Sequence, residues 1–225
     1  MTLLREIQGL FSRTYAGTGV NLEDFVVGDS RQRQLEARAG ESVAELSHLA
    51  RTYLRRTGGQ LRVAVYYAGE VIENLEAHPP QNGLSEENIH AFIMFVEEVN
   101  HAHHAMLRFL EGHAGPMGEE FIRDLELQSR VDTYLVLLLY SARSRGVSRV
   151  GTRQREWLLD CLFGRESFGY SRAQLSHRYR EVNRLGLRYV RYLNGLPGPE
   201  RVGSIRQWRP LDYTGKREFV EGLEA

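Results

Sequence analysis

The sequence predicts a mainly α-helical protein: a helical bundle of three long helices, with a small β element and short helices in the N-terminal third. Apolar residues recur with helical spacing over three long segments, residues 85–111, 118–140 and 172–193. One segment rich in β-branched and aromatic residues, 61–67, lies in the first third. With 42% hydrophobic and 26% charged residues, the composition is that of a folded globular chain.

The first eighty or so residues predict both short helices and short strands. A short amphipathic helix is expected at the N-terminus, and a short strand at residues 25–27. Residues 31–41 fit a strand or a helix equally well, whereas residues 41–56 are expected to form a helix that ends at Thr57-Gly58-Gly59. A short helix is expected over residues 71–77.

The segment 61–67, LRVAVYY, is the strongest strand candidate. A single strand is not stable by itself, so it must pair with another segment. The partners we consider are the segment containing Phe25, the segment containing Leu35, or another chain.

The segment 85–111 predicts the central helix, with Ser85 as N-cap and an end near Gly112. It has a broad apolar face and, opposite it, a narrow polar stripe that would meet water in a simple bundle. The stripe consists of His90, Glu97, His101, His104, Arg108 and Glu111.

The C-terminal part predicts two more long helices and a short one at residues 156–163. Gly186 lies within the apolar line of the last long helix, where it costs about 1 kcal/mol of helix propensity, so we expect a neighbouring helix to approach closely there. Residues 196–225 are expected to form an extended tail with a short terminal helix, anchored by Trp208. We interpret residues 1–225 as a single domain, with a mixed α/β part, 1–80, packed on a helical core, 85–195.

The net charge of zero conceals a strong asymmetry along the chain. Residues 1–132 hold 12 arginines and 20 carboxylates, a net charge of −8, whereas residues 133–225 have a net charge of +8. This split fits docking of the two halves, a homo-oligomer, or a basic surface for an anionic partner. A lone cysteine, Cys161, excludes an intrachain disulfide and favours a cytoplasmic location, and no apolar run is long enough to span a membrane.

One candidate site is a metal centre on the central helix. Side chains at i, i+4 and i+7 converge on one patch, and imidazole with carboxylate suits zinc or iron. The candidate ligands are Glu97, Glu98, His101 and His104. Glu98 and His101 have the Glu-x-x-His spacing that ferritin-like di-iron bundles use, a partial resemblance because no second such motif is present. The alternatives are a solvated polar face or a buried polar contact with another element.

A second candidate is a buried polar cluster. Gln128 and Asp132 lie on the apolar face of their helix, and a buried carboxylate must be paired or protonated. The partners we consider are His103, Arg178 and Asn183. Such a cluster usually fixes helix register, and a catalytic Asp132–His103 pair is the alternative.

A third candidate is a surface for an anionic partner on the last long helix, formed by Arg180, Arg184, Arg188 and Arg191. Together with the arginines of residues 143–155, it suits a phosphate backbone or an acidic protein. Tyr192 and Trp208 are the aromatic residues we consider for stacking with bases.

No phosphate loop, dinucleotide fingerprint, nucleophile elbow or His-Glu-x-x-His motif is present. We therefore predict no catalytic residues. The expected function is that of a cytoplasmic, non-enzymatic helical protein that binds another macromolecule or itself, without a cofactor. Iron or zinc binding and nucleic-acid binding are the alternatives.

Overall fold

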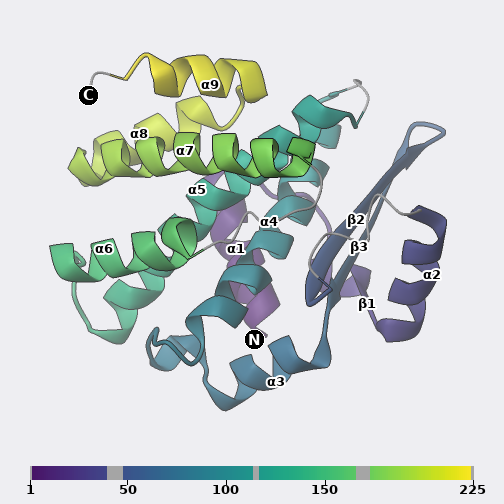
Figure 1. Ribbon diagram of the computed structural model, residues 1–225, viewed down its shortest axis with the longest axis horizontal. Coiled ribbons are helices and arrows are strands. Elements are labelled where there is room, and N and C mark those ends of the chain that lie inside the picture. The colour runs from purple at the N-terminus through teal and green to yellow at the C-terminus, as the bar shows by residue number, and fades with distance from the viewer. Residues whose placement is uncertain (1, 40–47, 114–116, 166–172, 224–225) are drawn as a thin grey trace.

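The computed structural model describes residues 2–39, 48–113, 117–165 and 173–223. Within these residues the fold is mainly α with a small three-stranded sheet, as predicted (Figure 1). The three long helices are α4 (Ile89–Leu110), α5 (Glu119–Ser144) and α7 (Ala173–Gly195). Helix α5 packs against both α4 and α7, so it forms a layer between the other two.

Helix α4 is the centre of the molecule because other elements cover it on several sides. It contacts α1 (Leu3–Thr14), α3 (Gly69–Ala77), α5 and the sheet. The expectation that its polar stripe faces water is wrong for the C-terminal half of the helix. His104 is only 2% exposed and Arg108 only 7%, because α5 and the C-terminal segment lie over them.

Helix α4 begins at Ile89 rather than at Ser85, and the residue before it, Asn88, fixes its start. The Asn88 side chain accepts a hydrogen bond from the Ser85 backbone N–H at 3.0 Å. Its amide donates to the carbonyl oxygens of Gly83 and His78, at 2.9 and 3.1 Å. The buried side chain of Asn88 thus connects the turn after the 3₁₀ helix η3 (Pro80–Asn82) with the end of α3 and the start of α4.

The sheet has the order β1-β3-β2, with β1 at Val26–Val27, β2 at Ala50–Thr57 and β3 at Gln60–Tyr67. Strand β3 pairs in parallel with β1 and in antiparallel with β2. The predicted helix over residues 41–56 is therefore wrong from residue 50 onward, and residues 41–47 lie outside the described part. Gly58 and Gly59 both have positive φ, +58° and +74°, which gives the two-residue turn that closes a β-hairpin.

The two faces of the sheet pack against different helices. On one face Tyr67 stacks on Phe95 of α4, with ring centres 4.6 Å apart. On the other face, Tyr66 donates to Asp29 of α2 (Asp29–Ala39) at 3.0 Å. Helix α2 follows the 3₁₀ helix η1 (Leu22–Phe25) and β1, so residues 31–39, which fitted a strand or a helix equally well, are helical. The sheet thus shields one flank of α4 and separates it from α2.

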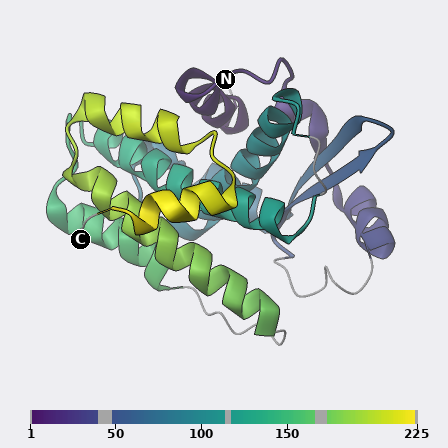
Figure 2. The same ribbon diagram turned by 90° about the horizontal axis from the view of Figure 1, so that it is seen from above.

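The C-terminal third is more helical than expected. Helix α6 (Thr152–Leu159) continues into the π-helical turn η4 (Asp160–Gly164). The segment 196–225, expected as an extended tail, contains α8 (Gly198–Trp208) as well as α9 (Tyr213–Glu221). Figure 2 shows both helices at the end of the molecule away from the sheet, where α8 contacts α7 and α9 contacts α5 and α7.

Two features of this region were predicted from single residues. Trp208 is fully buried, with its ring centre 4.4 Å from that of Tyr189, as expected of an anchor. A Cβ on Gly186 would lie 3.2 Å from Phe163 and 3.4 Å from the Cβ of Arg130 on α5, so the predicted close approach is confirmed. None of the helices in the described ranges has the length and apolar character needed to cross a membrane.

Candidate functional site

The four predicted metal ligands lie on α4 but contact different partners. Glu97 forms an ion pair with Arg130 at 3.0 Å. Glu98 Oε2 lies 3.4 Å from Nδ1 of His101, whose Nε2 lies 3.6 Å from Oε2 of Glu126. His104 instead contacts Asp124, with Nε2 3.3 Å from Oδ2.

His101 is held as a cation between two carboxylates. Burial opposes its charge, but Glu126 and Glu98 outweigh that effect and raise the pKa of His101 well above 6.5. Both ring nitrogens then carry protons, whereas a metal ligand must offer a free nitrogen lone pair. Among the described residues, no group of three or more histidine, cysteine or acidic side chains has an arrangement that could hold a metal ion. Metal binding stays a prediction.

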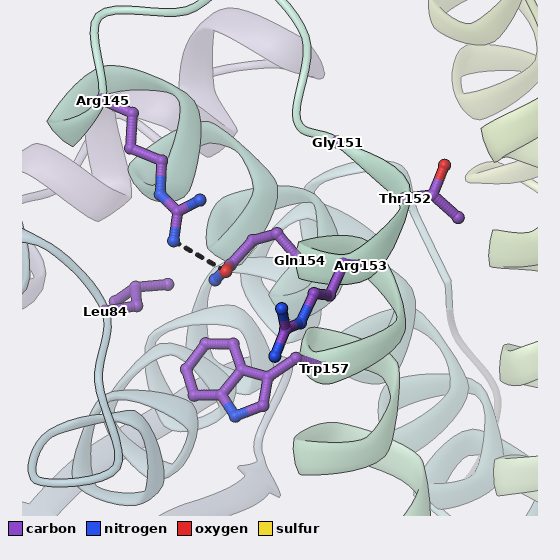
Figure 3. A pocket seen from close by; sticks show the side chains of 7 residues that line it. All are labelled: Leu84, Arg145, Gly151, Thr152, Arg153, Gln154 and Trp157. Carbon is purple, nitrogen blue, oxygen red and sulfur yellow. Dashed lines mark hydrogen bonds between the residues drawn. The ribbon is translucent and has the colours of Figure 1, made fainter.

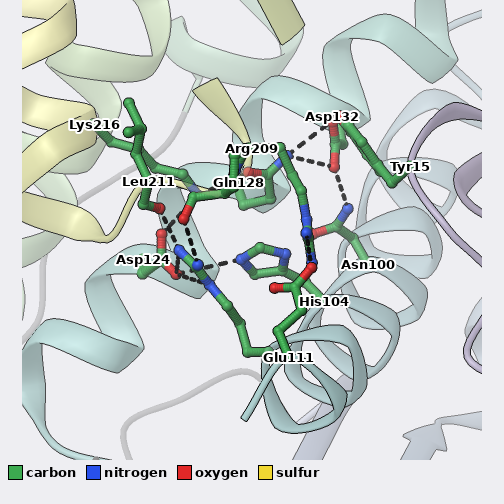
Figure 4. A network of polar contacts seen from close by, with 12 residues as sticks. Tyr15, Asn100, His104, Glu111, Asp124, Gln128, Asp132, Arg209, Leu211 and Lys216 are labelled. Carbon is green, nitrogen blue, oxygen red and sulfur yellow. Dashed lines mark hydrogen bonds and ion pairs between the residues drawn. The ribbon is translucent and has the colours of Figure 1, made fainter. Parts of the chain in front are cut away.

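A network of buried polar side chains instead connects α4, α5 and the C-terminal helices (Figure 4). Its centre is Asp124, which is 4% exposed. Asp124 accepts from Nζ of Lys216 at 2.6 Å, from Nη2 of Arg108 at 2.8 Å and from Nε2 of His104 at 3.3 Å. Burial opposes ionisation, yet these neighbours hold the pKa of Asp124 far below its ordinary value.

Lys216 brings α9 into this network. Its side chain is fully buried, and Nζ donates to Asp124 and, at 2.7 Å, to Oε1 of Gln128. The ammonium also lies 4.7 Å from the centre of the Trp208 ring. Burial lowers the pKa of Lys216 to about 8, against the attraction of Asp124, so the lysine is charged at neutral pH.

Asp132 is the second carboxylate of the network. It accepts from Asn100 at 2.6 Å, from Gln128 at 2.9 Å and from the hydroxyl of Tyr15. Burial raises the pKa of Asp132, while these three hydrogen bonds act in the opposite direction. The carboxylate thus ties the end of α1 to α4 and α5.

The structure brings together only part of the predicted polar cluster. Gln128 and Asp132 are direct partners, but Nε2 of His103 lies 3.1 Å from the carbonyl oxygen of Ala16. Arg178 pairs with Glu119, and Asn183 donates to the carbonyl of Phe163 at 2.8 Å. The sequence did contain a signal for the real network, because its members recur every four residues on two helices: Asn100, His104 and Arg108 on α4, and Asp124, Gln128 and Asp132 on α5.

The four arginines of the predicted stripe on α7 fall into two pairs with different surroundings. Arg184 pairs with Glu221 at 3.1 Å, and Arg188 donates to the carbonyl oxygens of Glu221 and Leu223, so these two arginines hold the end of α9. Arg180 and Arg191 are exposed and form no ion pair with any residue in the described part of the chain.

A denser basic surface lies where α5 ends and α6 begins. Residues 143–156 contain five arginines and a single glutamate, a net charge of +4. Within the described residues, four of these arginines have no carboxylate at ion-pair distance. Arg155 is half-buried and donates to the carbonyl oxygen of Asn194 and to Thr152. The other three are exposed, and we call them the arginine trio: Arg145, Arg149 and Arg153. Arg149 and Arg155 also lower the pKa of Arg201 on α8, after its burial, so like charges gather at this end of the protein.

A surface cavity of about 620 Å³ opens beside the trio (Figure 3). It is lined by Leu84, Arg145, Gly151, Thr152, Arg153, Gln154 and Trp157. Trp157 is only partly buried, and its indole N–H donates to Glu86 at 2.8 Å. For base stacking the sequence indicates Trp208 and Tyr192 rather than Trp157, whose place beside two arginines depends on how α6 docks.

No protein-family model matches this chain, and no curated protein or solved structure matches it either. Its function must therefore be inferred from the geometry alone.

Proposed function

We propose that this chain is a non-enzymatic binding protein and that the arginine trio (Arg145, Arg149 and Arg153) receives an anionic macromolecule. The observation that carries this proposal is a contrast in charge: opposite charges are paired inside the protein, whereas the arginines where α5 ends and α6 begins have no paired carboxylate in the described structure. Asp124 and Lys216 neutralise one another in the interior, whereas the trio meets no carboxylate in the described ranges.

Clustered like charges repel one another and lower the stability of the folded chain. An anionic partner would remove that repulsion and release bound counterions, which favours association at low salt. The nearest acidic residues in sequence, Glu156 and Asp160, do not compensate the trio: Asp160 pairs with Arg165, and Glu156 forms no ion pair in the described structure.

The ionisable groups of the interior support the non-enzymatic part of the proposal. His104, Asp124 and Lys216 use their polar atoms on one another, and none of the three lines the cavity beside the trio. A catalytic acid or base must reach its substrate within hydrogen-bond distance. This network is better suited to fixing how α4, α5 and α9 pack.

The test is binding to heparin, a polyanion without bases or peptide, over a series of salt concentrations. We expect Arg145→Gln/Arg149→Gln/Arg153→Gln to weaken binding about tenfold or more at low salt, since several charge contacts are lost together. The matched control is Arg180→Gln/Arg191→Gln, which removes the exposed arginines of the stripe on α7. Equal loss in both variants, or no binding by the natural chain at low salt, would rule out the proposed surface.

A further inference from the structure

We infer that the cavity beside the arginine trio takes an unpaired nucleotide of a single-stranded nucleic acid, with its base against Trp157 and its phosphates at Arg145 and Arg153. This inference rests on the proposed function and names the class of its partner. It is carried by a cavity that combines an aromatic ring, an aliphatic side chain and guanidinium groups.

The aromatic part of the cavity is Trp157. Because its N–H is already bonded to Glu86, the ring offers the cavity its apolar surface rather than a hydrogen-bond donor. Leu84 also lines the cavity and adds to its apolar part (Figure 3). Bases stack on such rings whatever their identity, so this contact favours a nucleotide without reading its sequence.

The charged part of the cavity comes from Arg145 and Arg153. Arg145 donates to Gln154 at 2.7 Å, a neutral partner that orients the guanidinium and leaves its charge uncompensated. Glu86, which accepts the hydrogen bond from Trp157, is paired with Arg165, and hydrogen bonds from Arg165 and Trp157 lower the pKa of Glu86 to about 2. Arg165 lies between Glu86 and Asp160 and offsets part of their charge, which weakens their repulsion of a phosphate.

The extent of the basic surface favours a single-stranded nucleic acid over a free nucleotide as the ligand. A volume of about 620 Å³ lies in the range of sites for one small molecule. Arg149 does not line the cavity, yet it belongs to the same unpaired trio. A mononucleotide would leave Arg149 unused, whereas a strand places further phosphates on both sides of the stacked base.

Tryptophan fluorescence is a selective probe of this site. The chain has two tryptophans, and Trp208 is fully buried beneath Tyr189 and Lys216. Quenching by a ligand therefore reports on Trp157. We propose to titrate the full chain at low salt with an oligodeoxythymidine of about 12 nucleotides, an abasic strand of the same length, thymidine monophosphate and polyglutamate.

We expect the thymidine strand to quench the emission and to bind about tenfold more tightly than the abasic strand. Trp157→Leu should remove that advantage, Trp157→Phe should restore most of it, and Arg180→Gln/Arg191→Gln should leave it unchanged. Because the two Trp157 variants lack the reporting indole, the affinities of all variants are measured by the fluorescence anisotropy of end-labelled strands. Circular dichroism checks that each variant is folded.

Equal affinity for the thymidine and abasic strands, or tighter binding of polyglutamate, would overturn the inference while leaving the proposed anion-binding surface intact. Thymidine monophosphate that quenches at the same concentration as the strand would show a free nucleotide as ligand and also overturn it. If neither these ligands nor heparin binds, the proposed function fails as well.

Discussion

Nζ of Lys216 lies 2.6 Å from Oδ1 of Asp124, and solvent reaches neither charge to any extent, with side-chain exposures of 0% and 5%. This ion pair fastens α9 to α5 at the point where α4 also contributes Arg108 and His104. Two buried charges are stable together only when each has its partner and its hydrogen bonds.

Replacing Lys216 by methionine should therefore lower the free energy of unfolding by about 3 kcal/mol, because Asp124 loses its closest cation. Urea denaturation measures this change. The control is Arg184→Met, whose pair with Glu221 is about half exposed on both sides and should cost about 0.5 kcal/mol or less. Lys216→Met combined with Asp124→Asn should recover part of the loss; a double variant no better than Lys216→Met alone would contradict the pairing.

Stability should decline as the pH falls below 6.5, before most carboxylates titrate. Burial, with Lys216 nearby, lowers the pKa of His104 to about 3 from 6.5. Between these values the unfolded chain binds a proton that the folded chain does not, so the free energy of unfolding falls with falling pH by about 1.4 kcal/mol per pH unit. His103, whose burial lowers its pKa to about 4, acts with the same sign.

The variant His104→Gln isolates this effect, because glutamine has no proton to gain. Urea denaturation at several pH values between about 6.5 and 4 should give a shallower pH dependence than that of the natural chain. Identical slopes would show that His104 is protonated in the folded protein.

A methyl group at Gly186 should destabilise the protein although alanine is the better helix former. The added Cβ would lie 3.2 Å from the Phe163 ring, closer than ordinary contact, and 3.4 Å from the Cβ of Arg130, at the limit of ordinary contact. We expect Gly186→Ala to cost about 1 kcal/mol, since overpacking outweighs the gain in propensity. Gly203→Ala on α8 is the matched control, because nothing lies within 4 Å of its Cβ position. Thermal unfolding should show that Gly203→Ala is neutral or stabilising, and a similar gain at Gly186 would refute the close approach.

Removal of the Asn88 side chain should lower the free energy of unfolding more than removal of the Ser85 side chain, although the sequence predicts Ser85 as the helix cap. Asn88→Ala removes three hydrogen bonds and leaves backbone groups of Ser85, Gly83 and His78 without this partner. We expect a loss of about 2–3 kcal/mol in urea denaturation, against about 0.5 kcal/mol or less for Ser85→Ala. The reverse order would restore Ser85 as the cap.

His101 provides the test of the metal hypothesis. Since Glu98 and Glu126 hold its ring as a cation, we expect no stoichiometric zinc or iron in protein purified without a histidine tag. Elemental analysis of the natural chain and of His101→Ala decides the matter. One equivalent of metal that disappears in the variant would contradict the ion-pair interpretation.

The long helices could be predicted because their apolar spacing persists over many turns, and the strand at residues 60–67 because β-branched and aromatic residues are concentrated there. Strand β2 could not be separated from a helix by periodicity alone. Its apolar residues Ala50, Tyr53 and Leu54 also fit a helical face, and the pairing with β3 decided the outcome. The glycine pair at residues 58–59, directly before a strong strand, is a hairpin signal that also fits the end of a helix.

The candidate site was less predictable because it depends on which helix faces which. Asp132 on an apolar face indicated a buried partner, but nothing local identifies Tyr15, which lies 117 positions away. The stripe of α4 was expected to meet water because a wheel drawn for one helix does not show how many neighbours surround it. Arg108 shows the difference: its guanidinium reaches both Asp124 and the carbonyl of Pro210.

The insertion of Lys216 also has a consequence for the order of events during synthesis. Asp124 and Lys216 are 92 positions apart, so a ribosome completes α4, α5 and α7 well before it adds the lysine. Until then the nascent chain carries a carboxylate at the junction of two helices that lacks its closest counter-charge. The buried charge of Asp124 therefore gains its closest partner only when α9 docks and brings in the ammonium group of Lys216.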